Sequence, residues 1–293
     1  MSEATGPAAG HIAAGVQIAT KQKQKRAKRR GLWRLVRRAV RRAEELNRSH
    51  AVHGERAVFD NAMFPWVAEI EAEWRLVRAE LERLLARQEE LPAFQEVVSD
   101  ATQVTRDRHW KTVFLLGYGV RFKRNIARCP ETWRILQKVP GLKTAMFSIL
   151  EPGNHIPPHR DPYNGVLRLH IGLIVPEPRD RLAIRVADQV CHWEEGKALV
   201  FDDHFEHEAW NGTDQTRVVL FADFAKPLRF PANLVNGLLL GLARFTPRVR
   251  DGRRRHRAWE ERFYASGRKW RTAQPLGVVR SLLGTRRSSV EPG

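Results

Sequence analysis

The sequence has little cysteine and no apolar run long enough to span a membrane. Its 293 residues include two cysteines, Cys129 and Cys191, which form no Cys-x-x-Cys motif. Two isolated cysteines exclude a disulfide framework, so we expect a reducing compartment, the cytosol. The longest apolar stretch, 230–245, contains Pro231 and Arg244 and is shorter than the roughly 20 residues of a spanning helix. Neither a secretory signal nor a solenoid repeat is visible.

Acidic residues are scarce relative to basic ones, but only at the two ends of the chain. Lys and Arg number 51 against 33 Asp and Glu, which gives a net charge of +18 and a pI near 10.9. Residues 21–42 carry +12 and residues 244–293 carry +10, whereas residues 43–243 sum to −3. A basic body would indicate a nucleic-acid-binding protein. Because the excess belongs to the ends, we do not expect specific recognition of nucleic acid.

The first basic end predicts an amphipathic helix and linker over 31–60, preceded by a disordered basic tail over 1–30. Such a helix can lie on an anionic membrane surface, with Trp33 at the level of the headgroups. The alternatives are non-specific binding to nucleic-acid phosphates and a plainly solvated tail. Its apolar positions are Leu32, Leu35, Val36, Ala39, Val40 and Ala43, and the opposite face carries Arg34, Arg37, Arg38, Arg41 and Arg42.

The second basic end repeats this pattern over 230–265, where an apolar stretch is followed by a run of arginines. We expect an amphipathic helical segment here and a disordered basic tail over 266–293. An ordinary buried helix with a charged exit is the alternative. Taken together, the two ends favour an anionic membrane surface as a partner.

The middle of the chain predicts one domain over 61–229, with helices first and strands after them. Apolar residues between Phe64 and Arg87 step by three and four, which is typical of a helix packed on a core. After about residue 110, short apolar runs alternate with turn sequences such as EPGN, PYNG and NGTDQT. This is the pattern of an antiparallel sandwich or barrel, so the fold class is α+β with a mainly β core.

Two segments place ligand-capable side chains in otherwise apolar strands: HIPPHRDPYNGVLRLHIGLIVP from His155, and WEEGKALVFDDHFEHEAWN from Trp193. His159 and Asp161 are two residues apart, so in an extended chain they project from one side and can share a metal ion. The second segment offers His204 or His207 as a further ligand. Two histidines and one carboxylate suit non-heme iron(II).

Three further polar residues alternate with apolar ones in predicted strands. Arg168 and His170 share one face of the strand 167–173, where a buried guanidinium and imidazole call for an anionic ligand. Arg217 opens the strand RVVLFADF and can bind a carboxylate bidentately. The alternatives are that Arg217 pairs with Asp202, Asp203 or Asp223, and that each histidine is a hydrogen-bonded core residue.

From about Phe64 to Pro227 the chain resembles the aspartyl/asparaginyl β-hydroxylase family, through the two segments quoted above and RVVLFADF. The resemblance implies a double-stranded β-helix of the jelly-roll or cupin type. It also implies iron(II), 2-oxoglutarate and dioxygen, with decarboxylation of the cosubstrate coupled to hydroxylation of an unactivated C–H bond. By motif, the iron ligands are His159 and His207, the 2-oxoglutarate carboxylate is bound by Arg217, and the cosubstrate pocket is lined by Ser148, Arg168, His170 and Trp110.

The resemblance leaves the metal role of Asp161 open. The eukaryotic branch, which hydroxylates peptides, has glycine at this position and uses two protein ligands. Asp161 therefore either completes a set of three ligands or turns outward into a salt bridge with Arg160 or Arg185. No role follows for His155.

The substrate class depends on which branch the chain resembles more. The bacterial branch hydroxylates acyl chains of lipids such as lipid A or ornithine lipids, and the eukaryotic branch hydroxylates Asp or Asn in peptides. The basic ends favour a lipid, hydroxylated at the inner face of the membrane, where each nearby Lys or Arg contributes about 1 kcal/mol. The alternatives are a peptidyl or free Asp/Asn hydroxylase and, from another class, a non-catalytic basic module that binds membrane or nucleic acid. No oligomeric state follows from the sequence.

Overall fold

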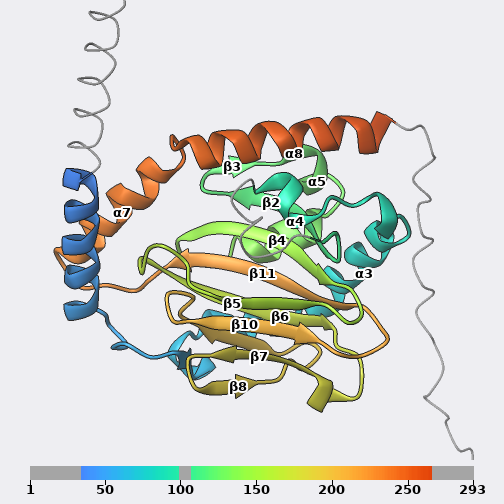
Figure 1. Cartoon of the computed structure of the whole chain (residues 1–293), viewed down its shortest axis with the longest axis horizontal. Helices are drawn as coiled ribbons and strands as arrows, with labels where there is room; N and C mark the ends of the chain where they lie inside the picture. Colours follow the sequence, from blue (N-terminus) through green and yellow to red (C-terminus); the bar gives the residue numbers. More distant parts are fainter. Residues whose placement is uncertain (1–33, 99–106, 266–293) are drawn as a thin grey trace, which may run out of the picture.

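The computed structural model describes residues 34–98 and 107–265, and Figure 1 shows two antiparallel sheets covered on one side by helices. The tails expected over 1–30 and 266–293 lie outside the described residues. This arrangement confirms the expected α+β class with a mainly β core.

The larger sheet has seven strands and forms the middle layer of the molecule. Both of its central strands, β6 and β11, are nine residues long and buried along almost their whole length. The order across this sheet is β1 (Val58–Phe59), β9 (Ala198–Phe201), β6 (Val166–Ile174), β11 (Arg217–Ala225), β4 (Leu142–Leu150), β2 (Trp110–Gly117) and β3 (Val120–Arg121).

The smaller sheet has four strands and packs face to face on the larger one. Its order is β5 (His155–His159), β10 (His207–Asn211), β7 (Leu182–Val186) and β8 (Gln189–Cys191). Ile184 and Ala209 of the smaller sheet share a core cluster with Val219 and Phe201 of the larger one. Two antiparallel sheets around a common core form the predicted double-stranded β-helix.

Alternation along β6 shows how the larger sheet serves two cores. Leu167, Leu169 and Ile171 belong to a cluster shared with the helices, whereas Arg168 and His170 point the other way, toward the smaller sheet. Because successive side chains of a strand point to opposite faces, one strand supplies the helical core and the interior between the sheets. Polar groups inside the protein are thereby gathered on one face.

The helices on the outer face of the larger sheet include the predicted segment 64–87. This segment is two helices, α2 (Trp66–Ala72) and α3 (Trp74–Leu85), because Glu73 leaves helical geometry at φ −107° and ψ 9°. The other short helices before α7 are the α-helices α4 (Phe94–Val97), α5 (Lys123–Ile126) and α6 (Pro130–Leu136) and the 3-10 helices η1 (Asn61–Met63), η2 (Gln88–Glu90) and η4 (Arg179–Arg181).

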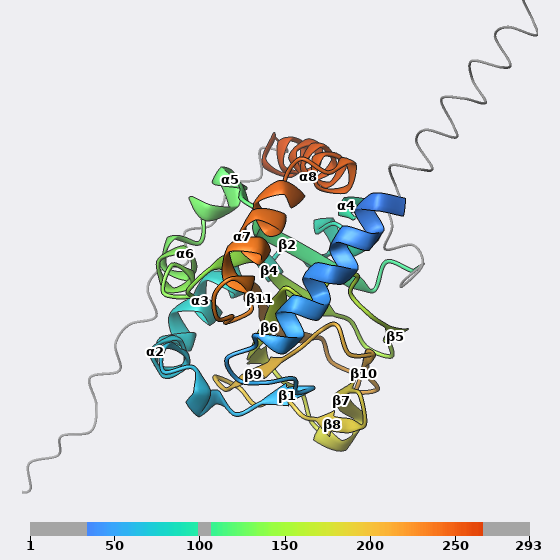
Figure 2. The same cartoon turned by 90° about the vertical axis from the view of Figure 1, so that its left-hand side faces the viewer.

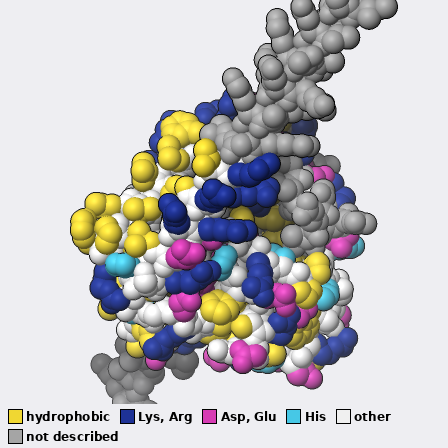
Figure 3. All heavy atoms as spheres, turned by 60° about the vertical axis from the view of Figure 1, so that its left-hand side comes forward, with side chains coloured by type: hydrophobic (Ala, Val, Ile, Leu, Met, Phe, Trp, Pro, Cys, Tyr) yellow, Lys and Arg dark blue, Asp and Glu magenta, His cyan; other side chains and the backbone are white. Residues whose placement is uncertain are grey.

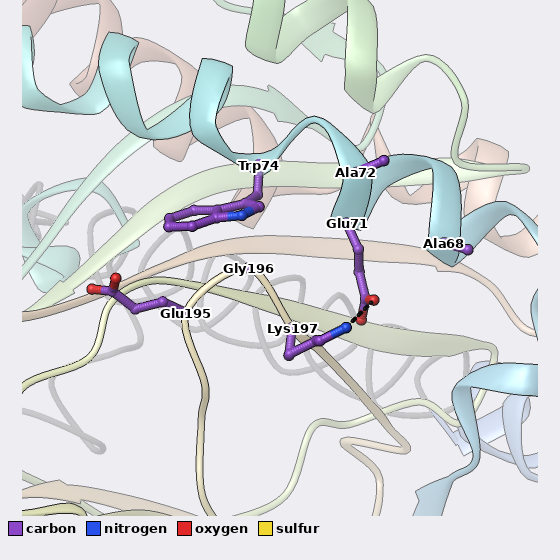
Figure 4. A pocket seen from close by; sticks show the side chains of 7 residues that line it. All are labelled: Ala68, Glu71, Ala72, Trp74, Glu195, Gly196 and Lys197. Atoms are coloured by element: carbon purple, nitrogen blue, oxygen red, sulfur yellow. Dashed lines mark hydrogen bonds and ion pairs between the residues drawn. The ribbon is translucent and has the colours of Figure 1, made fainter. Parts of the chain in front are cut away.

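A shallow hollow of about 290 Å³ lies where α2 and α3 meet the loop before β9 (Figure 4). Glu71 accepts a hydrogen bond from the backbone of Ala198 at 2.8 Å and pairs with Lys197 at 3.2 Å. Gly196 has φ +75°, and a Cβ there would lie 2.5 Å from the Trp74 ring nitrogen. The hollow contains none of the predicted site residues, and its contacts fasten the helices to the sheet.

The two basic regions of the chain both contain helices, and these helices lie at one end of the larger sheet (Figures 1 and 2). They are helix 34–49, α7 (Ala232–Ala243) and α8 (Pro247–Ala265). Within the described residues, no helix is both long enough and apolar enough to cross a membrane. The fold therefore brings together two regions that are almost two hundred residues apart in the sequence.

A hydrogen-bond network joins both ends to the loop that precedes β6. Asn47 of helix 34–49 donates to the Tyr163 hydroxyl at 3.1 Å and to the side chain of Asn164 at 3.0 Å. Tyr163 donates to Asn236 of α7 at 2.9 Å, and Asn236 donates to the Gly165 carbonyl at 2.8 Å. Because Asn47 and Asn236 are buried, these bonds fix the loop between two helices.

Candidate functional site

The two histidines expected to bind iron face each other across a pair of strands. His159 of β5 and His207 of β10 are direct partners in the antiparallel register, and their ring centroids are 4.2 Å apart. The Nδ1 of His159 bonds to the Pro157 carbonyl at 2.8 Å, and the Nδ1 of His207 bonds to the Phe205 carbonyl at 3.0 Å. A carbonyl partner fixes the proton on Nδ1, so Nε2 of each ring keeps its lone pair.

Burial keeps both rings neutral. It lowers the pKa of His159, and burial together with the nearby Arg168 charge lowers the pKa of His207 to about 3. The Nε2 of His207 is buried and has no hydrogen-bond partner among the described residues. Neutral imidazole with a bare nitrogen is the form that binds a metal ion, and a backbone acceptor on the other nitrogen is typical of metal-binding histidines. The pair therefore fits a metal ion.

Asp161 lies close to the pair in sequence, but its carboxylate is engaged elsewhere. Its Oδ2 lies 2.6 Å from Nη2 of Arg168, rather than beside Arg160 or Arg185, the partners considered from the sequence. Arg185 instead pairs with Glu208 at 2.6 Å. In the part of the chain that the structure describes, no group of three or more His, Cys, Asp or Glu side chains is arranged to hold a metal ion.

Arg168 was expected to face an anionic ligand, and in the structure it is surrounded by carboxylates of the protein. Besides Asp161, it pairs with Asp203 at 2.7 Å and with Asp223 at 2.8 Å, and its guanidinium lies 4.3 Å from the Phe221 ring centre. Burial, opposed by Arg168 and reinforced by the charges of Asp161 and Asp223, raises the pKa of Asp203 well above its usual value. We refer to Arg168, Asp161, Asp203 and Asp223 as the Arg168 cluster.

Arg217 has the opposite character, because it is buried without a carboxylate. It is 1% exposed, and within the described residues its one hydrogen bond runs from Nη1 to the Ser148 carbonyl at 3.3 Å. Its guanidinium lies over the Trp193 ring, 4.5 Å from the ring centre, and its Nε has no partner. Burial lowers the pKa of Arg217 to about 9.

The acidic partners considered for Arg217 are taken by other cations. Asp203 and Asp223 belong to the Arg168 cluster, and Asp202 pairs with buried Lys226 at 2.6 Å. A buried cation that lacks a counter-ion is costly, and binding an anion removes that cost. Arg217 is therefore suited to receiving a carboxylate from a ligand.

His170 supplies a second unpaired donor beside Arg217. The Nε1–H of Trp193 donates to Nδ1 of His170 at 3.3 Å, which places the ring proton on Nε2. That Nε2 is buried and has no partner among the described residues. Burial, followed by the Arg217 and Arg168 charges, lowers the pKa of His170 well below its usual value. Both donors lie against Trp193 and fit the carboxylate of a small acid.

Ser148 and Trp110 adjoin these donors, as the family motif implied, and Thr112 joins them. Trp110 Nε1 donates to the Ser148 hydroxyl at 3.0 Å, and its ring stacks on Phe94 with centroids 3.9 Å apart. Thr112 is the direct cross-strand partner of Ser148, and its buried hydroxyl has no partner in the described chain. Neither Thr112 nor Trp193 was predicted from the sequence. Counting two residues along the strand from Trp110 could have found Thr112.

The two other histidines of the motif lie apart from the pair. His204 Nδ1 contacts the Asp161 carbonyl at 3.1 Å, and His155 pairs with Glu208 at 2.8 Å on the rim of the smaller sheet. His155 is 51% exposed at its side chain. Of the two candidates for the distal ligand, the structure brings His207 and not His204 to His159.

Comparison with known proteins agrees with this geometry. The model of the aspartyl/asparaginyl beta-hydroxylase family matches residues 71–227, more than half of the chain. An ornithine lipid ester-linked acyl 2-hydroxylase from Rhizobium tropici is 59% identical over 229 residues, which cover 78% of this chain and 82% of that protein. A human aspartyl/asparaginyl beta-hydroxylase is 31% identical over 166 residues, 55% of this chain and 21% of the human protein.

These matches confirm the family resemblance seen in the sequence. Members of this family are hydroxylases that depend on iron(II) and 2-oxoglutarate, so the chain is an enzyme of the dioxygenase class. The double-stranded β-helix, the facing histidines and the unpaired Arg217 agree with that assignment. The chain belongs to the aspartyl/asparaginyl β-hydroxylase family.

Proposed function

We propose that this enzyme hydroxylates an unactivated C–H bond in an acyl chain of a membrane lipid, using iron at His159 and His207 and 2-oxoglutarate at Arg217. The observation that carries the proposal is the combination, within the described residues, of two facing imidazoles whose Nδ1 atoms bond to backbone carbonyls and a buried arginine that has no carboxylate partner. A metal ligand set and an anion site inside one β-sandwich are the parts that this chemistry needs.

Each residue has a role that follows from its contacts. His159 and His207 would hold the metal, and the Pro157 and Phe205 carbonyls engage Nδ1 of each ring, which leaves the Nε2 lone pairs to bind the metal. Arg217 binds a carboxylate of 2-oxoglutarate and relieves its own desolvation. When bound, iron(II) supplies the activation of dioxygen.

Four more residues orient the cosubstrate. His170 donates from Nε2, and Trp193 keeps that proton in place through its bond to Nδ1. Ser148 and its partner Trp110 form the neighbouring wall. Because these groups are buried, they exclude water from the reacting region.

Two observations support a lipid substrate: the activity for which a similar protein is named, and the surface of the helices at the basic ends of the chain. The Rhizobium tropici relative is named for hydroxylating an ester-linked acyl chain of ornithine lipid. In this chain, α7 exposes three leucines on its outer side, Leu234 at 63%, Leu238 at 64% and Leu242 at 50%. Figure 3 shows hydrophobic side chains beside a band of Lys and Arg on this face. Apolar residues bordered by cations suit the inner face of a membrane, rich in anionic lipid.

The reaction is tested by succinate formation from 2-oxoglutarate with iron(II), in the absence of substrate. We expect turnover in the native chain and in His155→Ala, and none in His207→Ala. His155 is the matched control because it lies on the same strand as His159 and its side chain points to the rim. Equal turnover in the native chain and His207→Ala would overturn the enzymatic proposal.

The substrate is tested by mass spectrometry of lipids from cells with and without the protein. We expect a membrane lipid that gains one oxygen atom in an acyl chain only when the native protein is present. Hydroxylated aspartyl or asparaginyl residues with no altered lipid would instead support the peptide hydroxylase.

A further inference from the structure

An apolar cavity of about 570 Å³ lies between the larger sheet and the helices of the two ends. Its inner wall includes Phe114, Met146 and Phe221, which belong to a core cluster of their own. Its outer wall is made by helix 34–49, α7 and α8, which Figures 1 and 2 show over this end of the sheet. The volume is within the range of ligand sites, roughly 300–1,000 Å³.

The floor of the cavity is polar and borders the histidine pair. Asp161, Arg168, Asp203 and Asp223, the whole Arg168 cluster, line the cavity. This cluster lies close to the imidazoles, because Asp161 follows His159 by two residues and Phe201, the cross-strand partner of Arg168, has its ring centre 5.9 Å from that of His207. An apolar ligand in the cavity therefore extends from the helices toward the proposed iron site.

The outer wall separates the cavity from an apolar surface. Leu239 and Leu240 of α7 line the cavity, whereas Leu238 of the same helix is 64% exposed. Arg248 and Arg253 of α8 also line the cavity, which puts cations beside its apolar walls. A chain that is apolar along its length and joined to an anionic or phosphate-bearing head matches this combination.

We propose that this cavity holds the acyl chain of the lipid substrate and that α7 separates it from the membrane surface. The inference rests on the proposed function and names where its substrate binds. Because apolar walls confer affinity through buried area, each added methylene group tightens binding about fourfold until the cavity is filled. The enzyme selects its substrate by acyl-chain length as well as by headgroup.

The experiment measures binding of the fluorescent fatty acid cis-parinaric acid to the full chain, without iron or 2-oxoglutarate. Laurate, myristate and palmitate compete with the probe, and we expect affinity to rise along that series. Leu239→Trp fills the cavity and weakens probe binding about tenfold or more. Leu238→Trp, its matched control on the outward side of α7, binds as the native chain does. Val249→Phe narrows the cavity from a different helix, α8. It tests the same prediction if Leu239→Trp fails to fold.

Equal binding of the probe by the native chain, Leu239→Trp and Val249→Phe would overturn the inference. The inference would also be overturned if the native chain bound laurate, myristate and palmitate with the same affinity. The uncoupled succinate assay run in parallel separates this failure from failure of the proposed function. If succinate forms but the probe does not bind, the acyl-chain cavity is rejected and the dioxygenase function is retained. If the probe binds as expected but no succinate forms, the lipid-binding cavity is retained and the catalytic proposal is rejected.

Discussion

The hydroxyl of Tyr163 donates a hydrogen bond of 2.9 Å to the side-chain oxygen of Asn236 on α7. Tyr163 lies in the loop between the His159 strand and the Arg168 strand, so this bond ties a helix of the basic C-terminal end to the predicted active site. Gly165 in the same loop has no room for a side chain, because a Cβ there would lie 2.1 Å from Asn236 and 2.2 Å from the Tyr163 ring.

We expect Asn236→Leu to detach α7 from this loop and to slow substrate hydroxylation more than uncoupled succinate formation. The substitution removes the acceptor of the Tyr163 hydroxyl proton and one of the two donors to the Gly165 carbonyl, which keeps its bond from the Lys226 amide. The unpaired hydroxyl proton costs about 1–3 kcal/mol if it stays buried. Hydrogen exchange of α7 and of the loop, with kcat for both reactions, measures the effect. Asn233→Leu, at an exposed position of α7, is the control. Similar exchange rates in both variants would contradict the coupling.

Replacing Arg217 by methionine should stabilise the protein while abolishing cosubstrate binding. The guanidinium is buried with no carboxylate beside it, so an apolar side chain of similar length removes a desolvation cost of about 1–4 kcal/mol. Denaturation of the ligand-free protein measures the gain. With iron(II) and no oxygen, 2-oxoglutarate at about a hundred times its Kd should stabilise the native chain by about 2.7 kcal/mol and the variant by none.

The control for that experiment is Arg185→Met, because Arg185 pairs with Glu208 near the surface. We expect a stability change within about 0.5 kcal/mol and unchanged binding of 2-oxoglutarate. A less stable Arg217→Met protein that still binds 2-oxoglutarate would refute the assignment of Arg217 as the anion site.

Polar substitution of the outer face of α7 should weaken binding to anionic vesicles. Replacing Leu234, Leu238 and Leu242 by serine removes most of the exposed apolar area of this helix, each leucine contributing about 1.5–3 kcal/mol if fully buried in lipid. Sedimentation with vesicles at low and high salt measures the change. Val190→Ser serves as control, since Val190 is 54% exposed on the smaller sheet. Equal sedimentation of the triple variant and the native chain would exclude α7 as the membrane contact.

Lowering the pH should weaken the packing of α8 on the sheet, because His256 of α8 becomes protonated. This residue is fully buried between Phe122 and Trp259, and burial lowers its pKa from 6.5 to about 3. Its folded pKa is below its unfolded value, so the contribution to stability is complete above pH 6.5. It falls by up to about 1.4 kcal/mol per pH unit between pH 6.5 and about pH 3.

His256→Gln retains an acceptor for the Phe114 amide but does not titrate in this range. We expect its unfolding free energy to depend less steeply on pH than that of the native chain, with the residual slope due to buried histidines such as His170 and His207. Denaturant unfolding at several pH values measures both slopes, and His109→Gln at an exposed position is the control. Parallel pH profiles for the native chain and His256→Gln would contradict this.

The parts of the site that follow a local pattern could be predicted from the sequence. His159, His207 and Arg217 stand in motifs whose strand periodicity orients them, and the structure brings the histidines together on adjacent strands. The Arg168 cluster could not be predicted, because its aspartates come from two loops and one strand that meet only in the folded protein. The orientation of Asp161 depends on that cluster.

In the helical layer too, one feature could be predicted from the sequence and another could not. Apolar spacing predicted helix across 64–87, but not the break at Glu73, whose carboxylate pairs with Arg134 and Lys138 of a distant segment. Those ion pairs lower the pKa of Glu73 to about 2, the hydrogen bond from Arg134 being the largest cause. Local periodicity sets the type of an element, whereas partners remote in sequence set where it ends.

The loop at Tyr163 also has a consequence for the order in which the chain is built. Its contacts reach back 116 residues to Asn47 and forward 73 residues to Asn236. During synthesis the strands that carry both histidines emerge before α7, so the loop acquires its last hydrogen bonds after most of the sandwich can fold. A nascent chain therefore completes the loop between the His159 strand and the Arg168 strand only when α7 has left the ribosome.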